Sequence, residues 1–149
     1  MKSIGRTLTA FALLGAGFLL GQAHAQQVAP PAPPRKPIMM TRIYAGPDGV
    51  SHAEEVEMKA TDRGIAEFAA TGAQFSSRLA GPPNTNWHTG PRRQFVITLS
   101  GRAELEVSDG TKVTTGPGHI NLIEDTTGKG HLTRNLEDRI VVTIPLADR

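Results

Sequence analysis

The feature of this sequence that most limits its fold is a series of short apolar or alternating runs, each ended by Gly, Pro, Asp or Asn. Runs of about four to eight residues with period-two alternation predict β-strands, and turn residues between them predict hairpins. The runs are "IMMTRIYA", "HAEEVEM", "QFSSRLA", "RQFVITLSG", "RAELEVSDG", "TKVTTGPG", "HINLIED" and "RIVVTIPL". About seven or eight strands at near-regular spacing predict an all-β sandwich or barrel.

Alternation and turn chemistry refine this expectation. In "RAELEV", Ala103, Leu105 and Val107 alternate with charged residues, which predicts an outer strand with one face toward the core and one toward water. The turn "GPDG" predicts a hairpin around Gly46–Gly49. Only the segment "TDRGIAEFAATG" has a helical pattern, and its two glycines weaken that interpretation.

The N-terminal residues predict export. Lys2 and Arg6 precede the apolar run "LTAFALLGAGFLL", and "AHA" supplies small residues for cleavage after Ala25, so residues 1–25 are interpreted as a signal peptide. This run is shorter than the ~20 apolar residues that cross a bilayer. We therefore expect a periplasmic or secreted protein with no stable membrane insertion after cleavage. Residues 26–37, "QQVAPPAPPRKP", predict an extended Pro-rich linker, and residues 38–149 predict one domain.

Charge and cysteine content exclude several classes of function. The chain has 16 Lys+Arg and 14 Asp+Glu, and the leader holds two of the basic residues, Lys2 and Arg6. The mature protein is thus nearly neutral, which gives no basis for a nucleic-acid partner. The chain has 0 cysteines, so disulfides, thiolate ligands and a thiol nucleophile are excluded.

Two histidine-bearing segments carry a family resemblance. In "WHTGPRRQFVITLSG", His88 stands six residues before Gln94, and in "TTGKGHLTRN", His131 follows Gly128 and precedes Asn135. At this spacing the segments resemble the two motifs of the cupin superfamily. The strings "PRRQFV", "LSG", "SDG" and "EDTTGKGH" are similar to a group of small single-domain, type-2-like cupins. The resemblance implies a single cupin jelly-roll β-barrel that binds a small-molecule ligand, and a homodimer formed through sheet edges.

The resemblance also implies a metal site at His88, Gln94 and His131. A typical cupin site offers three imidazoles and one carboxylate, which hold Fe, Mn, Ni, Cu or Zn and leave positions open for substrate. Here Gly90 stands at the second histidine position, and Gln94 replaces the carboxylate. An amide carries no charge to offset that of a divalent ion, so we expect any metal to be held weakly.

Trp87 and Arg92 are further candidates for the ligand pocket, each with a structural alternative. Trp87 is expected either to line the pocket beside His88 or to pack in the core. One of Arg92 and Arg93 is expected to face inward, where it would clamp a substrate carboxylate or form a structural ion pair with one of the two acidic residues at positions 124–125.

Three further residues, His52, His119 and Asp125, are polar and lie in or beside the predicted strands. His52 would supply a third imidazole only if its strand register turns it inward. His119 follows the turn "GPG" and is expected at the surface. Asp125 is expected either to act as a general base at the barrel mouth or to accept backbone N–H bonds in a turn.

Two functions follow from these observations. In the first, the protein is an exported small cupin that binds a small molecule in its barrel, with a weakly held divalent metal. In the second, it is a metal-dependent enzyme, a dioxygenase or an isomerase, that uses His88, Gln94 and His131. The sequence leaves open which of the two holds, and it does not identify the ligand.

Overall fold

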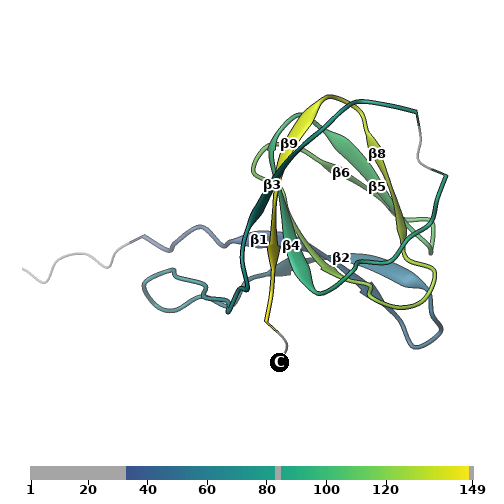
Figure 1. Ribbon diagram of the computed structural model, residues 1–149. Helices are drawn as coiled ribbons and strands as arrows, with labels where there is room; N and C mark the ends of the chain where they lie inside the picture. The colour runs from purple at the N-terminus through teal and green to yellow at the C-terminus, as the bar shows by residue number, and fades with distance from the viewer. Residues whose placement is uncertain (1–32, 83–84, 148–149) are drawn as a thin grey trace, which may run out of the picture. The chain divides into compact units, whose positions relative to one another are not determined.

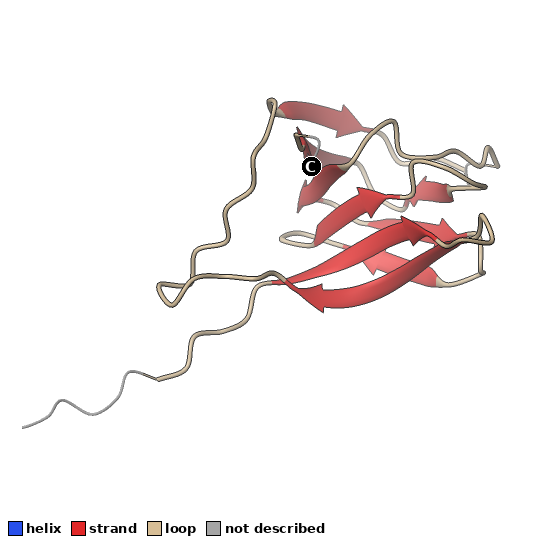
Figure 2. Cartoon of the chain, turned by 90° about the horizontal axis from the view of Figure 1, so that it is seen from below, coloured by secondary structure: helices blue, strands red, loops and turns tan. Residues whose placement is uncertain are grey.

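The computed structural model describes residues 33–82 and 85–147, and within these ranges the chain consists of strands, turns and loops without a helix (Figures 1 and 2). The all-β prediction is therefore confirmed. The segment "TDRGIAEFAATG", which had a helical pattern, forms turns and extended chain instead. In the described part, no helix is long and apolar enough to cross a membrane. The predicted signal peptide (1–25) and most of the predicted linker (26–37) lie outside the described residues.

The folded unit runs from Pro34 to the C-terminus. Its described part forms two sheets, one with the strand order β2-β1-β7-β4-β9-β3 and one with the order β6-β5-β8. The strands are β1 (Met39–Ala45), β2 (Ser51–Glu57), β3 (Gln74–Arg78), β4 (Gln94–Ser100), β5 (Ala103–Val107), β6 (Lys112–Thr115), β7 (Ile120–Glu124), β8 (His131–Asn135) and β9 (Arg139–Pro145).

Local sequence explains the hairpins of both sheets. β1 and β2 pair antiparallel around the predicted "GPDG" turn, which is closed by a 2.7 Å hydrogen bond from the Gly46 nitrogen to the Val50 oxygen. β5 and β6 pair around Asp109 and Gly110, where the Asp109 carboxylate accepts a 2.7 Å bond from the Thr111 nitrogen. An Asp-Gly pair supports this geometry, since the aspartate side chain caps the turn and glycine adopts the positive φ that the turn requires.

The six-stranded sheet carries one apolar cluster on each face. On one face, Met40, Phe95 and Leu122 form an apolar cluster, and Phe68 from the loop before β3 packs edge-on against Phe95 at 4.8 Å between ring centroids. Ile43 and Ile123 belong to a second cluster, with Leu105 and Val107 of the smaller sheet. Neighbours on one strand point to opposite faces, which explains why Leu122 and Ile123 enter different clusters. The predicted inward face of "RAELEV" is confirmed, since Ala103, Leu105 and Val107 are buried.

The two sheets face each other and enclose an interior, but the described strands do not form one continuous ladder, so the barrel is open (Figure 1). On one side, an isolated antiparallel bridge between His88 and His131 joins the segment before β4 to the smaller sheet. At the other end of the large sheet, β3 is an edge strand that exposes Phe75. The fold therefore places the two predicted histidines beside the barrel interior.

Candidate functional site

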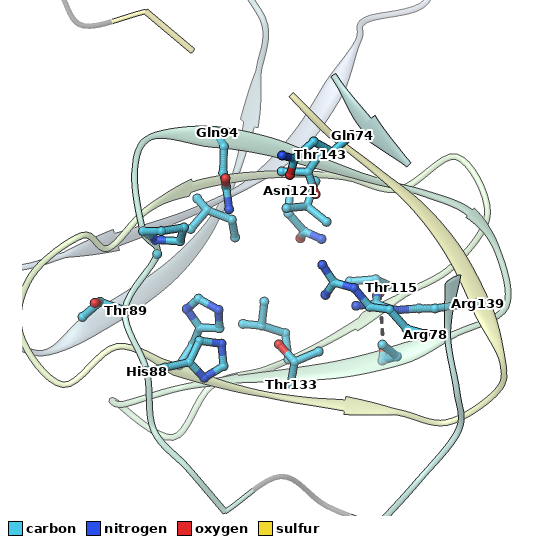
Figure 3. Close-up of a pocket in the computed structure, with 17 residues that line it drawn as sticks. Gln74, Arg78, His88, Thr89, Gln94, Thr115, Asn121, Thr133, Arg139 and Thr143 are labelled. Atoms are coloured by element: carbon cyan, nitrogen blue, oxygen red, sulfur yellow. Dashed lines mark hydrogen bonds between the residues drawn. The ribbon is translucent and has the colours of Figure 1, made fainter. Parts of the chain in front are cut away.

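A cavity of about 290 Å³ lies between the two sheets (Figure 3). Seven strands, β3 to β9, and the segment His88–Pro91 contribute its walls. The lining is mostly polar, with some apolar residues such as Val96, Leu105 and Ile123. The polar side chains that line it belong to Gln74, Arg78, His88, Thr89, Gln94, Thr115, Asn121, His131, Thr133, Arg139 and Thr143.

The backbone brings His88 and His131 together at one end of this cavity. The His88 nitrogen donates to the His131 oxygen at 3.1 Å, and the His131 nitrogen donates to the His88 oxygen at 2.9 Å. The two rings lie 4.6 Å apart between centroids, at an interplanar angle of 58°. Gln94, the first residue of β4, lines the same cavity. All three residues of the predicted metal site therefore border one space.

Asp125 holds the His131 ring in place. Its side chain is fully buried, and its Oδ2 accepts a 2.7 Å hydrogen bond from His131 Nδ1 and a 3.3 Å bond from Ser51 Oγ. Because an ionised carboxylate only accepts, the proton lies on Nδ1 and Nε2 is the ring nitrogen left for other partners. Sequence reasoning weighed Asp125 as a general base or as a turn carboxylate, whereas its contacts give it a positioning role behind His131.

His88 is oriented in a similar way, although it is exposed. Its Nδ1 donates to the backbone oxygen of Asn86 at 3.1 Å. Both histidines thus engage an oxygen acceptor through Nδ1, and each keeps Nε2 for a ligand. Metal-bound histidines in proteins usually have this arrangement, in which the second nitrogen bonds to a carboxylate or carbonyl oxygen.

The donor set is nevertheless small for a metal. Among the described residues, no group of three or more His, Cys, Asp or Glu side chains is arranged to hold a metal ion. Gly90, at the second histidine position of the cupin pattern, is buried, and a Cβ added there would lie 2.5 Å from Ile123 Cγ2. A histidine at this position would therefore displace the core. The residues present, two imidazoles and one amide, fit a weakly held divalent ion but not a tightly bound one.

Two arginines line the cavity away from the histidine pair (Figure 3). Arg78 ends β3 and Arg139 begins β9, and the two are direct partners in the antiparallel ladder between these strands. Arg139 is only 4% exposed, and its Nη1 donates to Thr115 Oγ1 at 3.3 Å. Burial, together with the charge of Arg78, lowers the pKa of Arg139 to about 10, and burial also lowers the pKa of Arg78.

Some polar atoms of the cavity-lining residues have no hydrogen-bond partner. They include Arg139 Nε and Asn121 Oδ1, both of them buried. Buried polar groups are nearly always paired in proteins, because an unpaired one keeps its full desolvation cost. The lining residues therefore retain hydrogen-bonding capacity that the described part of the chain does not satisfy.

The remaining predicted residues lie outside the cavity wall. Trp87 is partly buried and stacks with Lys129, whose Nζ lies 4.2 Å from the ring centroid. Arg92 is exposed, and the neighbouring Arg93 instead forms a 2.5 Å ion pair with Glu124. Neither Trp87 nor Arg92 lines the cavity. The sequence had suggested that one of these two arginines forms an ion pair with an acidic residue at positions 124–125. Arg93 is the arginine that forms it, with Glu124.

The other two histidines have partners of their own. His52 bonds through Nδ1 to Asp109 at 2.9 Å and stacks on Tyr44, so it does not supply a third imidazole to the cavity. His119 bonds to Thr41 through Nε2 at 2.9 Å and is partly buried rather than fully at the surface.

Sequence reasoning missed the arginine end of the cavity. A signal was present, because Gln74 and Arg78 share one face of β3, and Arg139 and Thr143 share one face of β9. The alternation did not reveal whether that face points inward, since this depends on pairing with distant strands.

No protein-family model matches the chain, and no curated protein matches it. The assignment of function therefore rests on the residues and their geometry.

Proposed function

We propose that this protein is an exported small cupin that binds a small molecule in the cavity between its sheets. The observation that carries the proposal is the roughly 290 Å³ polar cavity, whose wall includes buried groups that lack a partner in the described chain. This volume is close to the lower end of the range for ligand sites, about 300 Å³, so the ligand is small. The leader-like residues 1–25 support a periplasmic or secreted location.

In this proposal the chain's own residues orient the ligand from several directions. Asp125 fixes the His131 ring, so that Nε2 is presented in one tautomer and accepts a hydrogen bond at a defined position. The Gln94 and Asn121 amides offer both donors and acceptors, and threonine hydroxyls complete the wall. Side chains held by packing and hydrogen bonds bind a ligand with a smaller loss of conformational entropy than free ones.

A divalent metal is the second component of the proposal. His88 and His131 would hold it through Nε2, with Gln94 as the third ligand, and a bound ion would polarise an oxygen of the ligand. In both histidines Nδ1 bonds to an oxygen atom, as in most metal-bound histidines. This feature also favours the alternative function, a metal-dependent dioxygenase or isomerase at the same site. The absence of an anionic ligand among the three favours simple binding.

Metal analysis separates these components. Purified protein would be loaded in turn with Fe, Mn, Ni, Cu and Zn, dialysed, and assayed for bound metal beside H88A, H131A, the H88A/H131A double variant and the matched control H52A. We expect substoichiometric metal on wild type and H52A, with a loss in the three cavity variants. If wild type retains no more metal than the H88A/H131A double variant, the metal component and the enzyme alternative are both refuted.

Occupancy of the cavity tests the binding function itself. Native mass spectrometry would compare wild type with T133F, which places a ring in the cavity, and with T114F, which places the same ring on an exposed position of β6. We expect a copurified or added small molecule on wild type and T114F, and none on T133F. Equal occupancy in all three proteins would show that the molecule binds elsewhere.

A further inference from the structure

We infer that the ligand of this cavity carries an oxyanion group, a carboxylate or a phosphate, which binds between Arg78 and Arg139. This inference rests on the proposed binding function and adds the chemical class of the ligand. It places the anionic group at the arginine side of the cavity and the rest of the molecule toward the histidine pair (Figure 3).

Arg78 and Arg139 place like charges side by side in the sheet. Arg78 and Arg139 are direct partners across the β3–β9 ladder, so their side chains leave the same face of the sheet. Like charges at directly opposite positions destabilise a sheet. Neither arginine forms an ion pair with a carboxylate in the part of the chain that the structure describes. The two cations therefore share a wall with no internal counter-charge to explain them.

Arg139 is a buried cation whose hydrogen-bonding groups are only partly satisfied by the described residues. Its side chain is 4% exposed, one hydroxyl bonds its Nη1, and its Nε has no partner. A guanidinium keeps its charge at neutral pH, even though burial and the charge of Arg78 lower the pKa of Arg139 to about 10. A buried charge is costly unless it is paired. An anion between the two guanidinium groups would supply the missing charge and hydrogen-bond acceptors.

The shape and chemistry of this part of the cavity wall also fit an oxyanion. A guanidinium presents a planar fork of donors that matches the oxygens of a carboxylate or phosphate. The neighbouring wall residues Gln74, Asn121 and Thr143 are neutral and can donate hydrogen bonds to the same oxygens (Figure 3). No aspartate or glutamate lines this cavity among the described residues. The charge of the wall thus favours a negatively charged ligand.

Titration with matched probes tests the inference. Binding of benzoate, phenyl phosphate and the neutral analogue benzamide would be followed by backbone amide NMR shifts of cavity residues, in wild type, R78Q, R139Q and the control R92Q, whose side chain lies outside the cavity. We expect wild type and R92Q to bind at least one anionic probe more tightly than benzamide. Loss of one charge-assisted pair should weaken that binding about tenfold or more in R78Q and in R139Q.

The outcomes are distinguishable. Benzoate and phenyl phosphate separate the two sources of the oxyanion, and preference for either supports the inference. Equal affinity for benzamide and both anions, or unchanged affinity in R78Q and R139Q, would overturn it and leave the cavity as a neutral-ligand site. If none of the probes shifts any cavity residue, the inference fails, and occupancy measured with T133F decides the binding function separately.

A stability measurement excludes a purely structural role for the arginine pair. If Arg78 only repels its neighbour in the unliganded protein, the melting temperature of R78Q should equal or exceed that of wild type. A marked fall in melting temperature, with no change in anion affinity, would assign Arg78 to the fold and overturn the inference.

Discussion

The sharpest prediction concerns Gly130, the residue that leads into His131. Its φ is +78°, and a Cβ at this position would overlap the His88 carbonyl oxygen and lie 2.8 Å from the Thr89 nitrogen. These are backbone atoms, which cannot move aside as the end of a flexible side chain can. The substitution G130A should therefore force open the bridge between the two histidine segments.

The loss in free energy of unfolding caused by G130A has two contributions. A non-glycine residue at positive φ costs about 1–2 kcal/mol, whatever its surroundings. Opening the bridge also removes two backbone hydrogen bonds, of 3.1 Å and 2.9 Å, each worth about 1 kcal/mol. We therefore expect G130A to lower the free energy of unfolding by about 3–4 kcal/mol in total.

A matched variant, G118A, separates the loss of the two backbone hydrogen bonds from the cost of a non-glycine residue at positive φ. Gly118 has a φ of +82°, and a Cβ there would meet no atom within 4 Å, so G118A carries the conformational cost alone. Urea unfolding, followed through the fluorescence of Trp87, would measure both variants. We expect G130A to lose about 2 kcal/mol more than G118A, and to lose metal or ligand binding as well. Equal losses in the two variants would refute the reasoning that the histidine bridge depends on this close approach.

Three further predictions follow from the described contacts. D125A should lower the free energy of unfolding by about 3 kcal/mol, because it strips a buried imidazole of its partner, whereas H52A, which breaks the more exposed imidazole–carboxylate pair with Asp109, should lose less than about 1 kcal/mol in the same urea assay. Burial raises the pKa of Glu124, but its bonds to Arg93 and Arg42 outweigh this effect and hold the pKa below its ordinary value of 4.5. The stabilisation that Glu124 contributes is therefore complete above pH 4.5 and is lost as the pH falls through the lowered pKa. The free energy of unfolding, measured against pH, should fall less steeply in this acid range for E124Q than for wild type. The resemblance to cupins predicts a homodimer formed through sheet edges, and β3 is an edge strand that exposes Phe75. If the dimer forms through β3, light scattering should show F75K as a monomer. A dimer that persists in F75K would place the interface elsewhere.

Local sequence was sufficient for the strand content and several turns. The "GPDG" and "SDG" turns form as expected, because their conformations are set by a few adjacent residues. The alternation in "RAELEV" identified its buried face, since side-chain direction along a strand has a period of two. The helical pattern in "TDRGIAEFAATG" did not produce a helix; instead Phe68 packs on Phe95 and covers the sheet, a tertiary contact that outweighs a weak local preference.

The site was only partly accessible from the sequence. Motif spacing placed His88, Gln94 and His131 in one proposed cluster, but only the fold shows that Asp125 lies behind His131 and that Gly90 leaves no room for a third imidazole. The arginine pair was missed altogether. Arg78 and Arg139 are distant in the chain, and a shift of one residue in the pairing of either strand would turn the arginine of that strand outward. Periodicity is a local property that a sequence records, whereas long-range pairing and burial decide which face of a strand points inward, and in this protein they determine which side chains line the cavity.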